Sequence, residues 1–210
     1  MAFEARELRV GRNGVPLLAG LSFAVRAGQA LVLRGPNGIG KTSLLRSLAG
    51  LQPLMGGDLS EPADIWAYAA HADGVKGTLS VTENLAFWAQ IHGNSVTDEV
   101  FAWFDLEQLR DRAASRLSAG QRRRLGLARL AVAGRRGLLL DEPTVSLDTN
   151  SVALFARFIE RHLAGGGFAI IATHIDLGLN AQVLELEPYK AAPEATQDGF
   201  DAAFSDEAFL

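Results

Sequence analysis

The chain has 210 residues, of which 48% are hydrophobic, and it carries a formal net charge of −4 and no cysteine. This length and composition suit one globular domain, or one domain with subdomains. The missing cysteines exclude disulfides and thiol chemistry, the negative net charge argues against broad nucleic-acid binding, and no apolar run reaches the ~20 residues of a membrane helix.

The amino-terminal part is expected to form a small antiparallel sheet. It lacks the basic start and apolar stretch of a signal peptide, which favours a cytoplasmic protein. Two short β-like runs, Glu7–Val10 and Leu21–Arg26, are separated by turn signals at Gly14, Pro16 and Gly20.

A phosphate-binding pattern follows. The apolar run Gln29–Arg34 predicts a buried strand, and leucines at helical spacing through Leu51 predict a helix. Between them the pattern G-x-x-x-x-G-K-[ST] is met by Gly35, Pro36, Asn37, Gly38, Ile39, Gly40, Lys41, Thr42 and Ser43. A strand, a glycine turn and a helix aim backbone N–H groups at one point, which suits a triphosphate. Lys41 adds charge near the β- and γ-phosphates, and the Thr42 hydroxyl is a ligand for Mg²⁺.

The middle of the chain reads as a turn, a strand and a helical insertion. Pro53–Gly57 is predicted as the turn and Ile65–Ala70 as the strand. A helix opens with Ser80 and Glu83 in capping-box spacing, and helical patterns continue to about residue 110. Two tryptophans at helical spacing are expected in the core rather than on a partner surface: Trp88 and Trp103.

Another helix is predicted after Leu117–Gln121. Taken alone, Ser118 is the N-cap of this helix. Four arginines crowd the first part of the helix, where they are expected to form a solvated face: Arg122, Arg123, Arg124 and Arg129.

The last part of the chain alternates strands with a helix. Gly137–Glu142 and Phe168–Ala172 are predicted as buried strands, with an amphipathic helix over residues 151–163 between them. Gln182–Leu186 is expected as a last edge strand. Residues 191–210 contain acids but no base, which predicts a mobile tail or a weak terminal helix.

Polar side chains follow the two buried strands, at the strand ends where ligands bind in parallel sheets. Asp141 is expected to hold the Mg²⁺ sphere, directly or through water. Glu142 is expected to polarise the water that attacks the γ-phosphate. His174, one strand later, is expected to contact the γ-phosphate and to orient Glu142 and the water. The sequence therefore predicts an ATP hydrolase with Glu142 and His174 as catalytic residues.

The motifs occur in the order seen in the ATPase subunits of ABC transporters, a family that the chain resembles over about residues 5–187. The resemblance rests on Gly35–Ser43, Leu117–Gln121, Leu138–Pro143, Ser146–Asp148 and His174. It implies an α/β P-loop NTPase of the ABC ATPase type. Such a fold has a RecA-like parallel-sheet core, a small antiparallel β subdomain and a helical subdomain, here at about residues 73–132. One nucleotide-binding domain would cover residues 1–190, followed by the acidic tail at 191–210.

The resemblance also implies a homodimer. In the family, the segment that matches Leu117–Gln121 binds the γ-phosphate of ATP held by the opposite subunit, and here Ala119 replaces the first glycine of its pattern. Two ATP molecules would then lie between two head-to-tail subunits. Contacts to ATP in trans are implied for Ser118, Ala119, Gly120, Gln121 and Asp148.

One motif departs from the family. A glutamine usually follows the strand at Ile65–Ala70, where it touches Mg²⁺ or the attacking water and couples to the membrane subunit. Ala72 occupies that place, between His71 and Asp73. Either a neighbouring residue substitutes for the glutamine, or the coupling is weaker.

The adenine contact is a second open point. ATP-binding proteins often stack the base on an aromatic ring near the amino terminus, but no aromatic residue lies between Phe3 and Phe23. Either Arg12 or an apolar side chain stacks on the base, or the base is held loosely.

A narrower resemblance is to the ATP-binding subunits of the haem exporter of cytochrome c maturation. It is carried by Gly35–Arg46, Leu48–Leu51, Glu83–Trp88, His92–Gly93 and Leu117–Arg124. It implies an ATP-hydrolysing subunit, peripheral on the cytoplasmic face of the inner membrane, that works with an integral membrane permease and without nucleic acid. No haem ligand is indicated, because the four histidines are scattered along the chain.

Two other readings stay open: the ATPase subunit of another small exporter, and a soluble ABC-type ATPase that acts on an assembly or a ribosome. Those soluble relatives usually carry two ATPase halves or long inserted arms, and this chain has neither. A P-loop kinase or GTPase would not explain Leu117–Gln121 or Asp148.

Overall fold

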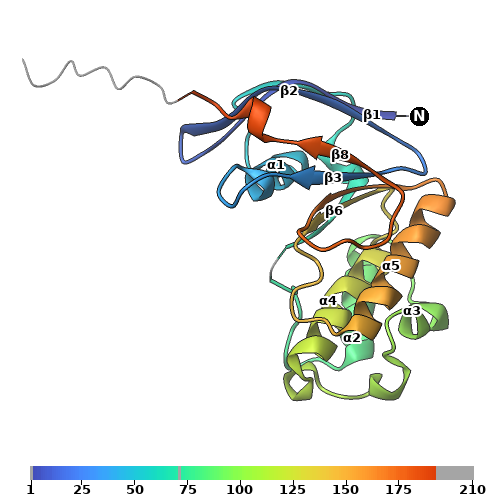
Figure 1. The fold of residues 1–210 in the computed structure, drawn as a ribbon. Coiled ribbons are helices and arrows are strands. Elements are labelled where there is room, and N and C mark those ends of the chain that lie inside the picture. Colours follow the sequence, from blue (N-terminus) through green and yellow to red (C-terminus); the bar gives the residue numbers. More distant parts are fainter. Residues whose placement is uncertain (1, 71, 193–210) are drawn as a thin grey trace, which may run out of the picture.

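The computed structural model describes residues 2–70 and 72–192 (Figure 1). His71 and most of the predicted acidic tail, residues 193–210, lie outside this part. The strands are β1 (Ala2–Arg12), β2 (Val15–Arg26), β3 (Ala30–Arg34), β4 (Gly56–Leu59), β5 (Trp66–Ala69), β6 (Gly137–Asp141), β7 (Phe168–Ala172) and β8 (Ala181–Glu185). The helices are α1 (Lys41–Leu48), α2 (Val81–Ile91), α3 (Asp98–Trp103), α4 (Ala119–Ala133) and α5 (Thr149–Ala164). Short 3₁₀ turns occur at Ala63–Ile65, Glu107–Leu109, Ala114–Arg116 and Glu187–Tyr189.

An antiparallel sheet with the strand order β2-β1-β4 covers one side of the molecule. Its hairpin is longer than predicted, and the turns expected at Pro16 and Gly20 are wrong, because both residues lie inside β2. Proline is tolerated there because β2 is an edge strand. Gly20 has a φ of +69° and lies where the register of β1 against β2 shifts. Strand β4 was missed, since Gly56 begins it inside the predicted turn Pro53–Gly57.

A parallel sheet with the strand order β5-β6-β7-β3-β8 forms the centre of the molecule. All five of its strands were predicted to within one residue at either end. Side chains alternate between its two faces, so Leu139 of β6 joins one buried cluster while Leu138 and Leu140 join the other. This alternation lets the sheet carry a helix on each face.

Helix α1 lies between the two sheets, where Leu44, Leu45 and Leu48 are fully buried (Figure 1). The helix predicted to run through Leu51 ends at Leu48, because Gly50 adopts a φ of +69° two residues later. Leu51 is therefore 58% exposed rather than part of the helix face.

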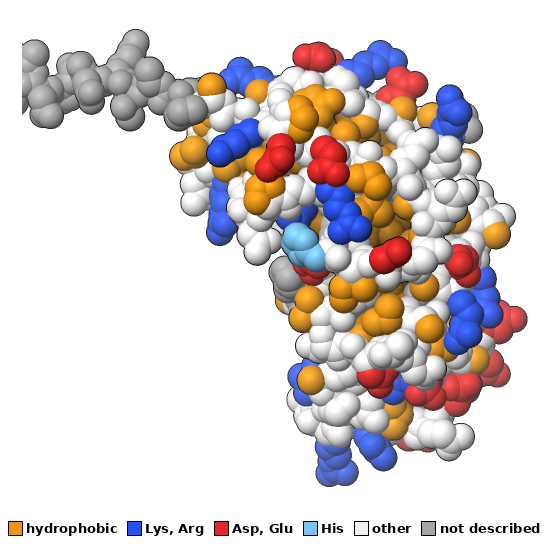
Figure 2. All heavy atoms as spheres, viewed as in Figure 1, with side chains coloured by type: hydrophobic (Ala, Val, Ile, Leu, Met, Phe, Trp, Pro, Cys, Tyr) orange, Lys and Arg blue, Asp and Glu red, His pale blue; other side chains and the backbone are white. Residues whose placement is uncertain are grey.

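Helices α2, α3, α4 and α5 pack below the parallel sheet (Figure 1). The predicted capping box at Ser80 and Glu83 opens α2. Trp88 and Trp103 pack against the core, but both are only partly buried and each also borders a surface pocket. The prediction of a solvated arginine face on α4 is wrong: Arg123 is only 4% exposed, and Arg122, Arg124 and Arg129 are half-buried. Acidic and basic side chains are interspersed over the face shown in Figure 2, rather than gathered by sign.

Candidate active site

The ends of three neighbouring strands build the site. The phosphate-binding pattern follows β3, the two acids end β6, and His174 follows β7, and these strands are adjacent in the order β6-β7-β3. A pocket of about 640 Å³ lies at these ends. It is lined by Arg12, Leu17, Asn37, Gly38, Gly40, Lys41, Thr42, Ser43, Asp141, Glu142, Val145 and His174. The structure thus brings most of the predicted phosphate-binding residues into one pocket with the predicted metal and catalytic residues, whereas Gly35, Pro36 and Ile39 do not line it.

The loop before α1 is held by its own lysine. Lys41 Nζ donates hydrogen bonds to the carbonyl oxygens of Gly35 (2.7 Å) and Pro36 (3.2 Å). The Lys41 side chain lies inside the loop, because the residue is only 8% exposed. Gly40 has a φ of +119°, and a Cβ there would lie 3.3 Å from carbons of Leu17 and Leu18, so only glycine fits. Ile39 is buried and anchors the loop in the core rather than lining the pocket.

Asp141 lies at the floor of the pocket and is only 2% exposed. The Tyr68 hydroxyl donates to its Oδ2 at 3.4 Å. Burial and the neighbouring Asp141 carboxylate raise the pKa of Tyr68 to about 12, so this tyrosine remains a donor at neutral pH. Sequence reasoning missed Tyr68, because a tyrosine in an apolar strand gives no signal of what it faces.

Glu142 has an unusual backbone. Its φ is +46°, a region that costs a non-glycine residue on the order of 1 kcal/mol. Its N–H donates to the carbonyl oxygen of Ala172 at 2.8 Å, which ties the end of β6 to β7. This conformation places Glu142 Oε1 3.4 Å from His174 Nε2. The expected proximity of the two side chains is therefore present.

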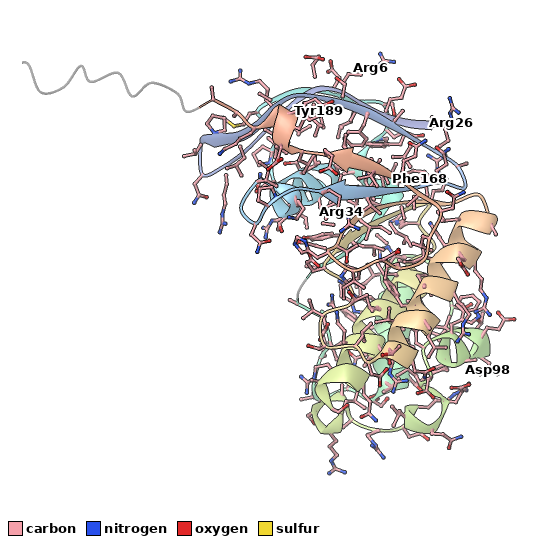
Figure 3. All side chains as sticks on the ribbon, in the orientation of Figure 1. Arg6, Arg26, Arg34, Asp98, Phe168 and Tyr189 are labelled. Carbon is pink, nitrogen blue, oxygen red and sulfur yellow. The ribbon has the colours of Figure 1, made fainter. Side chains whose placement is uncertain are left out.

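Arg34, labelled in Figure 3, is the last residue of β3. Its Nη1 donates to the carbonyl oxygen of Thr173 at 2.7 Å. The bond joins β3 to the residue directly before His174. Sequence reasoning missed this contact, because only the sheet order places β3 next to β7.

The oxygen atoms in the pocket suit a magnesium ion. Thr42 supplies a hydroxyl and Asp141 a carboxylate, and both line the same pocket. Among the described residues, no group of three or more His, Cys, Asp or Glu is placed to hold a metal ion. Mg²⁺ commonly binds through one or two protein oxygens together with phosphates and water, and Thr42 and Asp141 would supply two such oxygens.

The segment Leu117–Gln121 lies outside the pocket and caps α4. Ser118 Oγ accepts from the Gln121 N–H at 3.2 Å, and Gln121 Oε1 accepts from the Ser118 N–H at 3.0 Å. The predicted N-cap role of Ser118 is therefore confirmed. A Cβ at Gly120 would lie 3.3 Å from the Ser146 carbonyl oxygen, so this turn also packs against the segment before Asp148.

Asp148 likewise caps a helix of its own chain. Its Oδ1 accepts from the Ser151 N–H at 2.7 Å, and this hydrogen bond lowers the pKa of Asp148. Neither Asp148 nor the segment Leu117–Gln121 lines the pocket of about 640 Å³. Leu117 and Ala119 instead line a neighbouring pocket of about 340 Å³, and Val145 borders both pockets.

Two side chains of the antiparallel hairpin, Arg12 and Leu17, line the pocket beside the phosphate-binding loop. One is a guanidinium and the other is apolar, which are the two kinds of side chain expected to replace an aromatic ring against adenine. Of the described residues in the loop after β5, neither Ala72 nor Asp73 borders this pocket, and Asp73 borders the neighbouring one.

The chain is similar to known ATP-binding proteins. Residues 18–145 match the family model described as ABC transporter. The chain is 59% identical to the cytochrome c biogenesis ATP-binding export protein CcmA of Rhodobacter capsulatus, over 94% of this chain and 96% of that protein. The protein of that name from Paracoccus denitrificans is 56% identical, over 95% of this chain and 97% of its own length.

A solved structure has a similar fold. It is described as a putative ABC transporter (ATP-binding protein) from Pyrococcus furiosus, and it superimposes with a TM-score of 0.80 at 25% identity. The match covers 91% of this chain and 100% of that one. Within the described residues, no helix is both long enough and apolar enough to cross a membrane.

Proposed function

The chain belongs to the ABC transporter family of ATP-binding proteins, and on that premise we propose that it hydrolyses ATP to drive an export step in the biogenesis of c-type cytochromes. One observation carries the proposal: a single pocket gathers Lys41, Asp141, Glu142 and His174. The export role is supported by relatives that bear the name of cytochrome c biogenesis ATP-binding export protein over nearly their whole length.

The side chains divide the chemistry of hydrolysis between them. Lys41 and the backbone N–H groups of the loop bind the β- and γ-phosphates. As the oxygen of the attacking water bonds to the γ-phosphorus, Glu142 accepts a proton from that water. The bond between the γ-phosphorus and the β–γ bridging oxygen breaks. His174 orients Glu142 and donates to the γ-phosphate. Mg²⁺, held by Thr42 and Asp141, would neutralise charge on the phosphate oxygens.

The physiological role is tested by deleting the gene for this protein in its own host. Covalent c-type cytochromes should be lost while b-type haem proteins persist, because haem synthesis does not depend on export. Haem staining of membrane and soluble fractions after denaturing electrophoresis measures this. The wild-type gene should restore the stained bands, and a Glu142→Gln copy should not. If the deletion strain keeps its full set of c-type bands, the role in cytochrome c biogenesis is wrong, and only a role as the ATPase of another exporter remains.

A groove below β5 supports the proposal that the protein binds a membrane partner. It has a volume of about 500 Å³ and lies between the sheet and the helical layer. Leu51, Tyr68, Trp88 and Arg129 are among its lining residues, and Leu51 is 58% exposed at its border. We propose that a cytoplasmic segment of an integral membrane permease binds here, which would hold this chain on the cytoplasmic face of the inner membrane.

Leu51→Glu should lower the membrane-bound fraction of the protein several-fold when the permease is present, because it places a charge in an apolar contact. Affinity for ATP should stay unchanged, since Leu51 does not line the nucleotide pocket. Sedimentation of membranes with immunodetection measures the bound fraction. Val183→Glu is the matched control: Val183 is 57% exposed, on the opposite edge of the parallel sheet from β5. Equal membrane binding of both variants would rule out this groove.

We further propose that two copies of the chain pair head to tail, so that Ser118, Ala119, Gly120, Gln121 and Asp148 contact ATP held by the partner. The position of these residues outside the pocket of their own chain supports this arrangement. The Ser118 hydroxyl and the first N–H groups of α4 form an anion-binding helix terminus.

Ser118→Arg should lower ATPase activity roughly 10²-fold, the cost of removing a group that contacts the transferred phosphate. ATP binding by the isolated variant should be unchanged, as measured by calorimetry. Mixing this variant with Lys41→Ala subunits should restore part of the activity, because one of the two shared sites is then intact. Ser95→Arg, an exposed serine in the loop before α3, is the control. Loss of ATP binding by isolated Ser118→Arg would refute the contact in trans.

A further inference from the structure

A buried arginine of α4 joins the ends of two strands of the parallel sheet. Arg123 is 4% exposed. Its Nε donates to the carbonyl oxygen of Pro143 at 3.0 Å, and its Nη2 donates to that of Glu142 at 3.1 Å. Its Nη1 donates to the carbonyl oxygen of Ala70 at 2.9 Å, directly after β5. One guanidinium therefore binds the backbone directly after β6, at the catalytic carboxylate, and directly after β5.

The loop after β5 takes part through Asp73. Asp73 Oδ1 accepts from Arg123 Nη1 at 2.9 Å, and the two side chains are only 19% and 5% exposed. Asp73 also packs on the backbone of α4, since a Cβ added at Gly126 would lie 2.7 Å from the Cβ of Asp73. Ala72, next to it, has no side-chain polar atom. Among the described residues of this loop, Asp73 makes a charged link to α4.

The hydrogen bond from Arg123 binds the backbone of Glu142, which has an unfavourable conformation. Glu142 has a φ of +46°, an unfavourable conformation that persists only where surrounding contacts hold it. Its N–H is held by the carbonyl oxygen of Ala172 and its carbonyl oxygen by Arg123. A planar guanidinium with several fixed donors can hold separate carbonyl groups at once, whereas a lysine ammonium acts as a single point charge.

We propose that Arg123 and Asp73 are positioning residues for ATP hydrolysis: through their ion pair, the guanidinium sets the backbone of Glu142 according to the placement of α4 and of the loop after β5. The inference rests on the ATP hydrolysis proposed above. Because α4 begins at Ser118, a displacement of that helix terminus moves Arg123 and, with it, the carbonyl groups of Glu142 and Pro143. The loop at Asp73 acts on the same groups.

Two conservative variants test the pair in the full-length protein. Arg123→Lys keeps the charge but loses the planar guanidinium with its several fixed donors, and Asp73→Asn keeps an acceptor but loses the ion pair. Both should lower kcat about tenfold, equivalent to ~1.4 kcal/mol of transition-state stabilisation, while the Kd for ATP stays within about twofold. A merely structural role would lower the melting temperature without this split between kcat and Kd. Unchanged kcat, or a weaker Kd with unchanged kcat, would overturn the proposal.

The same helix supplies matched controls. Arg124 donates to the carbonyl oxygens of Phe104 and Asp105 and pairs with the Asp105 carboxylate, so it makes the same kinds of contact within the helical layer. Arg124→Lys and Asp105→Asn should leave kcat near the wild-type value. A loss of activity in these controls equal to that in Arg123→Lys and Asp73→Asn would also overturn the proposal.

Hydrogen exchange gives a readout that does not depend on turnover. A peptide covering residues 138–146 should exchange its amide hydrogens several-fold faster in Arg123→Lys than in the wild type and in Arg124→Lys. The carbonyl oxygens of Glu142 and Pro143 lose their hydrogen bonds to the guanidinium there, so the backbone around them opens more often. Equal exchange in all three proteins would refute the positioning role even if ATP hydrolysis is normal. Conversely, a wild-type protein that does not hydrolyse ATP would refute the proposed function, while the exchange still decides whether Arg123 holds this backbone.

Discussion

The Glu142→Gln variant is expected to bind ATP with near wild-type affinity and to hydrolyse it about 10²- to 10⁴-fold more slowly, the range for loss of a general base. Glutamine has nearly the shape of glutamate but cannot accept the proton of the attacking water. The backbone contacts of residue 142, to Ala172 and Arg123, do not involve its side chain. The structure around the pocket should therefore persist, and only the chemical step should fail.

Phosphate release under saturating ATP measures the turnover of Glu142→Gln, and calorimetry measures its affinity. Because ATP remains bound, size-exclusion chromatography with ATP should show an accumulated dimer. Glu160→Gln, an exposed carboxylate near the end of α5, is the control and should behave as wild type. A Glu142→Gln variant that turns over at the wild-type rate would remove Glu142 from the catalytic role.

Lys41→Ala should weaken ATP binding roughly 10- to 150-fold, because a hydrogen bond to a charged group contributes about 1.5–3 kcal/mol. The lysine also closes its own loop through the carbonyl oxygens of Gly35 and Pro36. Its removal therefore withdraws a charge from the phosphates and loosens the backbone that binds them. Both losses act on affinity, whereas Glu142→Gln acts on turnover.

Calorimetric titration with ATP in the presence of Mg²⁺ measures the Kd of Lys41→Ala. The control is Lys190→Ala, since Lys190 is exposed and does not line the pocket, although its backbone pairs with Leu18 of β2. A thermal melt should separate a local effect on the loop from a loss of fold. If Lys41→Ala binds ATP as tightly as Lys190→Ala, the phosphate role of Lys41 is wrong.

Local signals in the sequence were read correctly where short-range physics decides the structure. The strand and glycine turn before α1, the capping box at Ser80, the N-cap at Ser118, and the buried strands β6 and β7 all formed as predicted. Each depends on residues within a few positions of one another, through apolar runs, backbone torsion or side-chain capping. Most of the residues that line the pocket could also be predicted, for a different reason: the ends of neighbouring strands in one parallel sheet meet at one edge.

Errors arose where a distant segment decides the outcome. Pro16 and Gly20 look like turn residues, but pairing with β1 keeps them inside an edge strand. Strand β4 forms only because β1 offers it a partner. Arg123 is predicted in solvent because charged residues usually lie there, yet carbonyl groups directly after β5 and β6 give it enough partners to stay buried.

The sequence by itself determined the class of chemistry, because a phosphate-binding loop, an acid pair and a following histidine each need only local order to be identified. Only the tertiary structure decided how these groups are held. The hydroxyl of Tyr68 beside Asp141, the contact of Arg34 with Thr173 and the fork of Arg123 on Glu142 all join segments from separate strands or helices. Such contacts depend on strand order and on the placement of α4 against the sheet, which arise from packing of the whole chain and leave no spacing in the sequence.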